Sequence, residues 1–584
     1  MMKRNIIYNK VVGLALAALT FTACSDTWDE HYDAATDATI GVNAGSLWQA
    51  ISSNAELSNF ASVVKACDYD LRLGSSQVFT VFAPLNSQFS KAEADRLIAQ
   101  YQQEKNTGVR QEDNTVVKEF LQNHIALYNH SVSDVMEPAN ITMMNGKYQQ
   151  LTKSLFGGSQ LVSKSGNLYD NGLLFTIDKQ VEFFPNIFEY MTKDPDLDSL
   201  RSFLYNSLFY ELKFQESQSV AGGLNEAGQT VYLDSVFELQ NELFDIMNAE
   251  INNEDSTYWM IAPTNDVWSR LVEEYTPYFN YDPAVGDLLE KGTPDSLAYT
   301  NIRRAIVDGL FFSRTTNTDR MLADSAMSTQ SVLEYTRRNS RWGSDTLAYY
   351  QYMKPQQAPT GIFTGTTNVE CSNGIVMKAD DWKVKPTQTF ARTLIFEAER
   401  CLKERGTQER NGVKIETTTP YVYNVTRDNP YYSQISGHSF VEYHQELTTY
   451  DHNVTFNLTN VLSNMGYDIY LVVVPALASD TLARNIDRAP YKLCFTLGYH
   501  DAEGKEQTLM TTDRNGLATE ADSVQHVLVA ENFKFPICSY GVSEAIPQAT
   551  LRVETKVRSS ELRQGLYQRT MRIDCIILKP HEED

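Results

Sequence analysis

The sequence predicts a multidomain α+β protein in which a duplicated domain of helices and strands precedes an all-β, jelly-roll-like sandwich. Three observations lead to this prediction. A strand-and-turn motif occurs twice, at residues 79–89 (FTVFAPLNSQF) and 258–268 (YWMIAPTNDVW). After about Phe390, helical periodicity gives way to short runs that alternate apolar and polar residues. The chain of 584 residues is long enough for three or four domains of roughly 150 residues.

The composition is that of a folded, acidic chain. Apolar residues make up 42% of the sequence, which is typical of proteins that bury a core. The formal net charge is −24. Nucleic acids are bound through basic patches, so we expect the protein to have no nucleic-acid partner.

Residues 1–23 have the anatomy of a signal peptide. Lysine and arginine residues precede an apolar run from Val11 to Ala23, which is too short to span a bilayer but suits the core of an export signal. The run ends directly before Cys24 and resembles a relaxed bacterial lipobox, which implies that Cys24 becomes the lipidated first residue. The alternative is an ordinary secretory signal that happens to end beside a cysteine.

Residues 24–44 form an acidic tether after the cleavage point. The tether begins with Ser25, Asp26, Asp29 and Glu30 and carries no lysine or arginine. It resembles the tether that directs lipoproteins of the Bacteroidetes type to the outer face of the outer membrane. The resemblance implies a lipid-anchored protein facing the cell exterior, whereas the plainer interpretation is a solvated linker.

The repeated motif is predicted to be a buried strand that ends at Ala-Pro, turns at Asn and closes on an aromatic residue. The copies lie much farther apart than the roughly 20–50 residues of a solenoid repeat, so each belongs to a whole domain. The motif residues are Ala83, Pro84, Asn86 and Phe89 in the first copy, and Ala262, Pro263, Asn265 and Trp268 in the second.

The first domain is predicted to open with a helix capped by Ser46. Residues 116–128 are predicted to be a helix that runs into a strand, with His124 at the junction. A lone histidine there is a base, a metal ligand or a satisfied core residue, and we expect the last. An Asn171-Gly turn leads into the final strand, and Pro185 is predicted to open a closing helix.

These features resemble the signatures of the fasciclin (FAS1) adhesion-type domain. The resemblance implies one FAS1-like domain over residues 45–195 and a second, with insertions, over residues 196–390. In the second copy Asp308 is expected to stand where the first has its junction histidine, and Asn373-Gly repeats the closing turn. The second copy carries an insertion around residues 215–235 and a long tyrosine-rich segment at residues 275–281, and its extra length relative to the first copy is expected to be inserted loop, which usually carries recognition.

Residues 391–584 are predicted to form the β-sandwich, because seven alternating runs are separated by turn-rich stretches. Four aromatic residues could form a stacking platform for sugar rings, or they could pack an edge loop: Tyr421, Tyr423, Tyr431 and Tyr432. In the alternating run from His438 to His444, only Glu442 and His444 are near enough to share an ion. We expect no metal site.

The seven cysteines are widely spaced and show no metal-binding pattern. With Cys24 lipidated, six remain, and disulfides or buried thiols are both compatible with their spacing.

We expect a non-enzymatic binding protein without catalytic residues or a cofactor, because no familiar catalytic motif occurs in a fitting context. FAS1 lipoproteins of this kind resemble those found with SusC/SusD-type transport systems. The resemblance implies two partners, a SusC-like TonB-dependent transporter barrel and a SusD-like lipoprotein, and a glycan or peptide ligand. The alternatives are a free-standing adhesin or glycan- and matrix-binding surface protein, and a hydrolase that uses carboxylates of the sandwich.

The lipid anchor gives a first test. Cys24→Ala removes the thiol that would be acylated, so the variant should move from the membrane to the soluble fraction. Cell fractionation followed by immunoblotting measures this. If the variant still sediments with membranes after a high-salt wash, the lipid-anchor interpretation is wrong.

Overall fold

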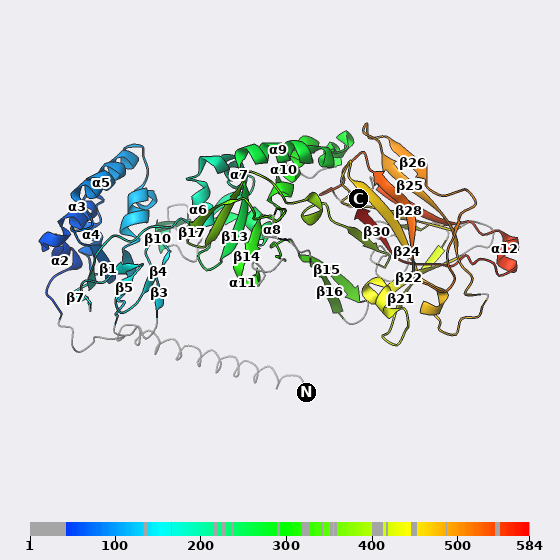
Figure 1. Ribbon diagram of the computed structural model, residues 1–584, viewed down its shortest axis with the longest axis horizontal. Coiled ribbons are helices and arrows are strands. Elements are labelled where there is room, and N and C mark those ends of the chain that lie inside the picture. Colours follow the sequence, from blue (N-terminus) through cyan, green and yellow to red (C-terminus); the bar gives the residue numbers. More distant parts are fainter. Residues whose placement is uncertain are drawn as a thin grey trace. The chain divides into compact units, whose positions relative to one another are not determined.

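The computed structural model describes residues 42–132, 138–164, 166–214, 220–224, 228–234, 237–288, 293–317, 326–330, 332–339, 343–350, 354, 359–399, 413–415, 418–445, 452–485, 487–542 and 549–582 (Figure 1). The chain divides into two compact units, Met1–Asn186 and Ile187–Asp584. Cys24, Ser25, Asp26, Asp29 and Glu30 lie outside the described residues. No helix in the described ranges combines the length and apolar character needed to cross a membrane.

The first unit is built on a mixed four-stranded sheet in the order β2-β1-β8-β7. The central strand β1 pairs with β8 in parallel and with β2 antiparallel. The sheet strands are β1 (Phe79–Pro84), β2 (Ile125–Leu127), β7 (Asn167–Tyr169) and β8 (Gly172–Ile177), and a second sheet contains β3 (Ala139–Thr142), β4 (Tyr148–Leu151), β5 (Leu155–Phe156) and β6 (Ser159–Gln160). The helices are α2 (Leu47–Ser53), α3 (Ser58–Ala66), α4 (Asp70–Leu73) and α5 (Lys91–Asn106).

Strand β1 is buried on both faces, which explains its nearly continuous apolar sequence. Phe79, Val81 and Ala83 belong to the core formed with the helices. Phe82 points the other way and stacks on Phe156, with ring centroids 3.6 Å apart. Ser46 caps α2, as predicted, by accepting a hydrogen bond from the Gln49 N–H.

The second unit repeats this sheet in the order β14-β13-β18-β17. The registers correspond, because Phe79 pairs with Gly172 in the first copy and Tyr258 with Gly374 in the second. This confirms the predicted duplication at the level of topology. Its strands are β13 (Tyr258–Pro263), β14 (Phe311–Ser313), β17 (Thr367–Cys371) and β18 (Gly374–Ala379), and its helices are α6 (Ile187–Met191), α7 (Asp198–Leu204), α8 (Glu242–Met247), α9 (Asn265–Tyr275), α10 (Pro294–Val307) and α11 (Arg314–Asn317).

The helix predicted to close the first domain instead opens the second. Helix α6 starts at Ile187, two residues after Pro185, and the Ile187 N–H donates to Asn373 Oδ1 at 2.9 Å. Leu47 of α2 makes the same bond to Asn171 Oδ1 in the first copy, at 2.7 Å. The boundary between the compact units accordingly falls after Asn186, whereas we had expected it near residue 195.

Three antiparallel strand pairs interrupt the second copy, and two of them flank or occupy the insertion expected around residues 215–235, whereas the position of the third was not predicted. They are β9 (Tyr210–Phe214) with β12 (Phe237–Asn241), β10 (Val220–Leu224) with β11 (Thr230–Asp234), and β15 (Val332–Asn339) with β16 (Gly343–Tyr350).

The tyrosine-rich segment is not a free recognition loop. Tyr275, Phe279 and Tyr281 are buried. The backbone O of Asn280 accepts a hydrogen bond from the Cys538 N–H at 2.7 Å, and Tyr281 Oη donates to the Tyr540 carbonyl at 2.8 Å. The segment therefore joins the second α/β domain to the C-terminal sheets.

Two antiparallel sheets make up the C-terminal part of the chain (Figure 1). The first contains β21 (Thr418–Asn424), β22 (Ser439–Gln445), β30 (Met571–Pro580), β24 (Gly466–Val473) and β28 (Gln525–Lys534), with β19 (Leu394–Glu397) paired to β30. The second contains β20 (Val413–Ile415), β23 (Asn453–Asn457), β29 (Ala549–Thr555), β25 (Lys492–His500) and β26 (Glu506–Met510), with β27 (Leu517–Ala518) paired to β25, and a helix α12 (Ser559–Arg563) follows β29.

All seven runs predicted to be strands lie in these sheets. Aromatic rings connect the two sheets: Tyr443 lies 6.3 Å from Phe456, and Tyr499 lies 5.4 Å from Phe533, between ring centroids. Buried apolar side chains of both sheets join one core with the preceding α/β domain.

Five cysteines fall within the described part of the chain. All five are buried and form no disulfide with one another: Cys67, Cys371, Cys494, Cys538 and Cys575. For these five, the buried-thiol alternative holds.

The core position of Phe82 gives a stability test. The side chain is fully buried and stacks between Phe156 and Phe175, so Phe82→Ala should lower the free energy of unfolding of the first unit by about 3–5 kcal/mol. Urea denaturation measures the loss, with the partly exposed Phe184→Ala as the matched control. A loss below about 1 kcal/mol would contradict the core placement.

Candidate functional site

The junction histidine of the first domain is a fixed structural element. His124 is fully buried. Its Nδ1 lies 2.8 Å from the Phe120 carbonyl oxygen, and its Nε2 accepts a hydrogen bond from the Val181 N–H at 2.9 Å. These partners define a neutral imidazole that donates through Nδ1. Both ring nitrogens are therefore occupied by the backbone, and neither is available to a substrate or a metal.

Its neighbour Asn123, which the sequence did not single out, completes a clamp. Asn123 Nδ2 donates to the carbonyls of Val181 and Glu182, both at 3.3 Å. Gln149 Nε2 donates to Asn123 Oδ1 at 3.1 Å. The Asn123–His124 pair thus fixes the segment that follows β8 against the end of the helical turn Val117–Leu121.

The position of Asp308 was predicted incorrectly. Strand pairing aligns Val81 with Ile125 in the first copy and Met260 with Phe311 in the second. The residue before the strand is therefore Leu310, not Asp308, and the Ile261 N–H donates to its carbonyl as Phe82 donates to that of His124. An apolar leucine replaces the histidine, so the two copies share no titratable group at this junction.

The asparagines of the repeated motif also serve the backbone. Asn86 Nδ2 donates to the Ala55 carbonyl at 2.9 Å, and its Oδ1 accepts from the Asn59 N–H at 3.0 Å. Asn265 makes the matching bonds to the Pro195 carbonyl, at 2.8 Å, and to the Ser199 N–H, at 2.9 Å.

The other motif residues are buried in both copies. Ala83 and Pro84, like Ala262 and Pro263, end the central strands β1 and β13. Phe89 stacks on Phe120 at 5.1 Å between centroids, and Trp268 lies 6.0 Å from Phe203. The motif therefore holds helices to the sheet.

The four predicted aromatic residues do not form one open platform. Tyr423, Tyr431 and Tyr432 are partly buried against a small core that includes Val425 and Phe440. Tyr432 stacks on His438 at 3.7 Å, so one face of its ring is covered. Tyr421 is the exception, with 52% of its surface exposed. Packing against this small core thus accounts for three of the four rings: Tyr423 from strand β21, and Tyr431 and Tyr432 from the loop that follows it.

Tyr421 contacts a group of paired charged residues that includes the buried Glu442. Its ring lies edge-on to His444, with centroids 5.0 Å apart. His444 Nε2 lies 2.5 Å from one carboxylate oxygen of Glu442, and Arg572 Nε donates to the other at 2.6 Å. Ser479 Oγ also donates to Glu442, at 3.0 Å. The two residues considered as joint ligands for an ion instead bind each other, and protein groups occupy both Glu442 oxygens.

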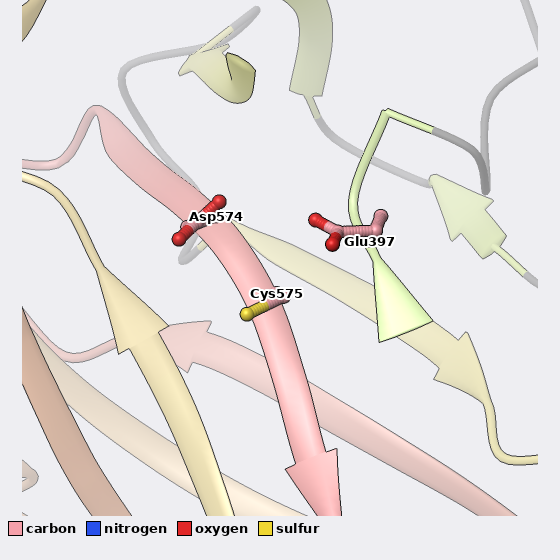
Figure 2. A group of neighbouring side chains, drawn as sticks. All are labelled: Glu397, Asp574 and Cys575. Atoms are coloured by element: carbon pink, nitrogen blue, oxygen red, sulfur yellow. The ribbon is translucent and has the colours of Figure 1, made fainter. Parts of the chain in front are cut away.

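A second group of titratable side chains lies at the junction of β19 and β30 (Figure 2). Glu397, Asp574 and Cys575 offer ligand atoms within 4.8 Å of one another, the one such group of three in the described part of the chain. Ser436 Oγ donates to Glu397, and its N–H donates to Asp574 Oδ2 at 2.9 Å.

This group is poorly suited to a hard cation. Figure 2 shows Glu397 approaching from β19, while Asp574 and Cys575 leave β30 in different directions. Burial, together with the negative charges of Asp574, Glu397 and Glu399, raises the pKa of the Cys575 thiol, so it stays protonated at neutral pH. Ca²⁺ takes about six to eight oxygen ligands, and the group offers only two carboxylates beside a neutral thiol. No sequence pattern indicates this group, because Glu397 and Asp574 are far apart in the chain.

The comparisons agree with the α/β part of the fold. Residues 55–181 match the Fasciclin domain family, so the chain contains a FAS1 domain in this stretch. No curated protein sequence is significantly similar to the chain.

Solved structures with a partial likeness include three of different kinds. A FAS1 domain pair of the insect cell adhesion molecule fasciclin I is 12% identical, covers 57% of this chain and 99% of its own, and has a TM-score of 0.19. The CBM22-1 xylan-binding domain of Paenibacillus barcinonensis Xyn10C is 16% identical over 33% of this chain and 95% of its own, with a TM-score of 0.20. A DUF4465 family protein of Bacteroides caccae is 10% identical over 32% of this chain and 100% of its own, with a TM-score of 0.12.

The neutral state of His124 predicts a pH dependence. Burial lowers its pKa from 6.5 to about 4, against the opposing hydrogen bond to Phe120. As the pH falls below about 6.5, the unfolded chain takes up the proton first. The stability that depends on the neutral ring is therefore complete above about pH 6.5 and is lost on the way down to about pH 4, by roughly 3 kcal/mol in all.

The variant His124→Gln keeps a donor and an acceptor but does not titrate in this range. Both proteins are unfolded in urea at pH 7 and at pH 5, and unfolding of the first unit is followed by pulsed hydrogen exchange of its peptides. Between pH 7 and pH 5 the wild type should lose roughly 2 kcal/mol more of its free energy of unfolding than His124→Gln loses. An equal loss in both proteins would mean that His124 is not the group responsible.

Proposed function

We propose that the protein is a lipid-anchored, surface-exposed, non-enzymatic binding protein, an accessory subunit of a SusC/SusD-type TonB-dependent nutrient import complex. Its ligand would be a glycan or a peptide. In this proposal Cys24 holds the chain in the outer membrane, two FAS1-like domains follow the tether, and residues 391–584 form a β-sandwich.

The observation that carries the binding role is the FAS1 domain at residues 55–181, since FAS1 domains are adhesion-type domains. The use of its polar residues supports the same role. His124, Asn86 and Asn123 each make hydrogen bonds to the protein backbone. These three residues of the domain thus build a scaffold, and a scaffold leaves recognition to the surfaces around it.

The import complex is supported by the sequence of the N-terminus. The lipobox-like run before Cys24 and the acidic residues after it are typical of surface lipoproteins that accompany such transporters. The acidic charge of the chain, −24, fits a protein that stays off an anionic membrane surface and is held by its lipid alone.

The alternative is a free-standing adhesin or glycan- and matrix-binding surface protein. The FAS1 domain favours it as much as it favours the import role, because adhesion is mediated by domains of this type. The two functions differ in partner: an adhesin needs no transporter.

Affinity capture separates them. The tagged full chain is extracted from native membranes in mild detergent, captured, and analysed by quantitative mass spectrometry. The import role predicts near-stoichiometric recovery of a TonB-dependent barrel and its SusD-like lipoprotein. A second lipoprotein with the same tag, expressed at a similar level, controls for carry-over of membrane.

Recovery of this chain alone would overturn the import role and favour the adhesin. Recovery of the barrel with both baits would show only shared membrane fragments and would also count against the proposal.

A further inference from the structure

A cleft in the first unit lies beside the Asn123–His124 clamp and is lined by the segment that the clamp holds. Its volume is about 860 Å³, within the range of roughly 300–1,000 Å³ that is typical of small-ligand sites. It lies between helix α5, the helical turn Val117–Leu121 and residues 179–184, which follow β8. All of its lining residues belong to the described part of the first unit.

The wall formed by residues 179–184 is held in place by the Asn123–His124 clamp. The clamp binds the N–H and the carbonyl of Val181 and the carbonyl of Glu182. Both clamp residues are fully buried, so the wall is tied to the core rather than to solvent-exposed groups. The cleft is therefore preformed, which lowers the entropy cost of binding a ligand.

Two aromatic rings line one side of the cleft. Phe183 has the Lys147 ammonium over its ring, 5.4 Å from the centroid. Phe184 is adjacent and 44% exposed. An exposed phenylalanine beside a cleft offers an apolar face to a ligand, and the C–H face of a sugar ring packs well on such a surface.

Amides and hydroxyls also line the cleft. They belong to Gln149, Gln180, Thr115 and Ser159. Ser159 is only 1% exposed, and its Oγ has no hydrogen-bond partner among the residues that the structure describes. Buried hydroxyls in folded proteins nearly always have a partner, so this one points to a ligand group that is supplied from the cleft.

The charges around the cleft nearly cancel. Arg96 donates two hydrogen bonds to the carboxylate of Glu93, at 3.0 and 2.8 Å. Lys179 supplies one more cation, while Glu119 and Glu182 supply two more carboxylates. With Lys147 over Phe183, the cations around the cleft equal the carboxylates in number, so a polyanion would meet no net positive charge here. An extended peptide is also disfavoured, because the clamp already occupies backbone groups of the wall that a strand would pair with.

We propose that this cleft binds a neutral oligosaccharide. The faces of its sugar rings pack on Phe183 and Phe184, and its hydroxyls bond to Gln149, Gln180 and the buried Ser159 Oγ. The assignment deepens the proposed function by naming the ligand class, and its biological use rests on that function.

Binding is tested with the full chain in detergent. Isothermal titration calorimetry is run with cellohexaose, xylohexaose, mannohexaose and maltohexaose as neutral probes, and with a heparin hexasaccharide and an uncharged hexapeptide as the other ligand classes. We expect at least one neutral hexasaccharide to bind, and neither of the other classes.

Two variants locate the site. Phe184→Ala should weaken binding about tenfold or more, and Ser159→Ala about fivefold, without a change in the thermal unfolding of the chain. Phe214→Ala is the matched control, since Phe214 is also a partly exposed phenylalanine, 39% exposed, in the second unit. It should bind like the wild type.

The proposal is overturned if no neutral probe binds at millimolar concentration, if heparin or the peptide binds instead, or if Phe184→Ala and Phe214→Ala bind equally well. Its failure is distinguishable from failure of the import role. A captured transporter without sugar binding would remove only this inference, whereas Phe184-dependent sugar binding without a transporter would remove only the import complex.

Discussion

Both α/β domains depend on one close approach between a turn and the first residue of the central strand. A Cβ atom on Gly172 would lie 1.9 Å from the Phe79 carbonyl oxygen, and one on Gly374 would lie 2.0 Å from that of Tyr258. Only glycine allows this approach, and its positive φ angle, 139° and 154° in the two copies, is likewise one that other residues avoid. The parallel strand pair can start at these residues for that reason.

The asparagine before each glycine ties this turn to the rest of its domain. Asn171 Nδ2 donates to the carbonyls of Leu73 and Ser75, and Asn373 Nδ2 donates to those of Ile251 and Asn253. The Oδ1 of each asparagine also accepts a hydrogen bond from the first N–H of the first helix in its domain. One buried amide thus joins the opening helix, the loop before the central strand and the closing strand. Its loss would leave several backbone groups unpaired in the core, which is costly.

The sequence was sufficient to predict those features that are local. The strands β1 and β13 follow from apolar runs that end at proline, and the seven C-terminal strands follow from alternation. Features that depend on register were predicted less well. Asp308 and Leu310 are two residues apart, and only the pairing of β13 with β14 decides which one corresponds to His124. Helix α6 was assigned to the wrong domain because its defining bond, to Asn373, spans nearly the whole second domain.

The candidate sites were the hardest features to predict, because the type of a residue does not determine whether its side chain is exposed. The sequence suggests that Tyr431 and Tyr432 form part of a binding platform, yet both are partly buried against the small core around Phe440. Gln149, Ser159 and Phe184 carry no motif, and only the tertiary structure brings them to one cleft.

The clamp that fixes the cleft wall is a feature of the first copy alone among the two matched positions. The residue corresponding to Asn123 in the second copy is Gly309, which has no side chain to clamp the segment after β18, and Leu310 stands in place of His124. The second copy instead uses aromatic residues for internal packing: Tyr275 and Phe279 are buried, and their rings lie 4.8 and 5.6 Å from Phe390 between centroids. The proposed oligosaccharide site depends on a wall that is held in place before a ligand binds, and the residues that hold it in the first copy have no counterparts at the same positions in the second.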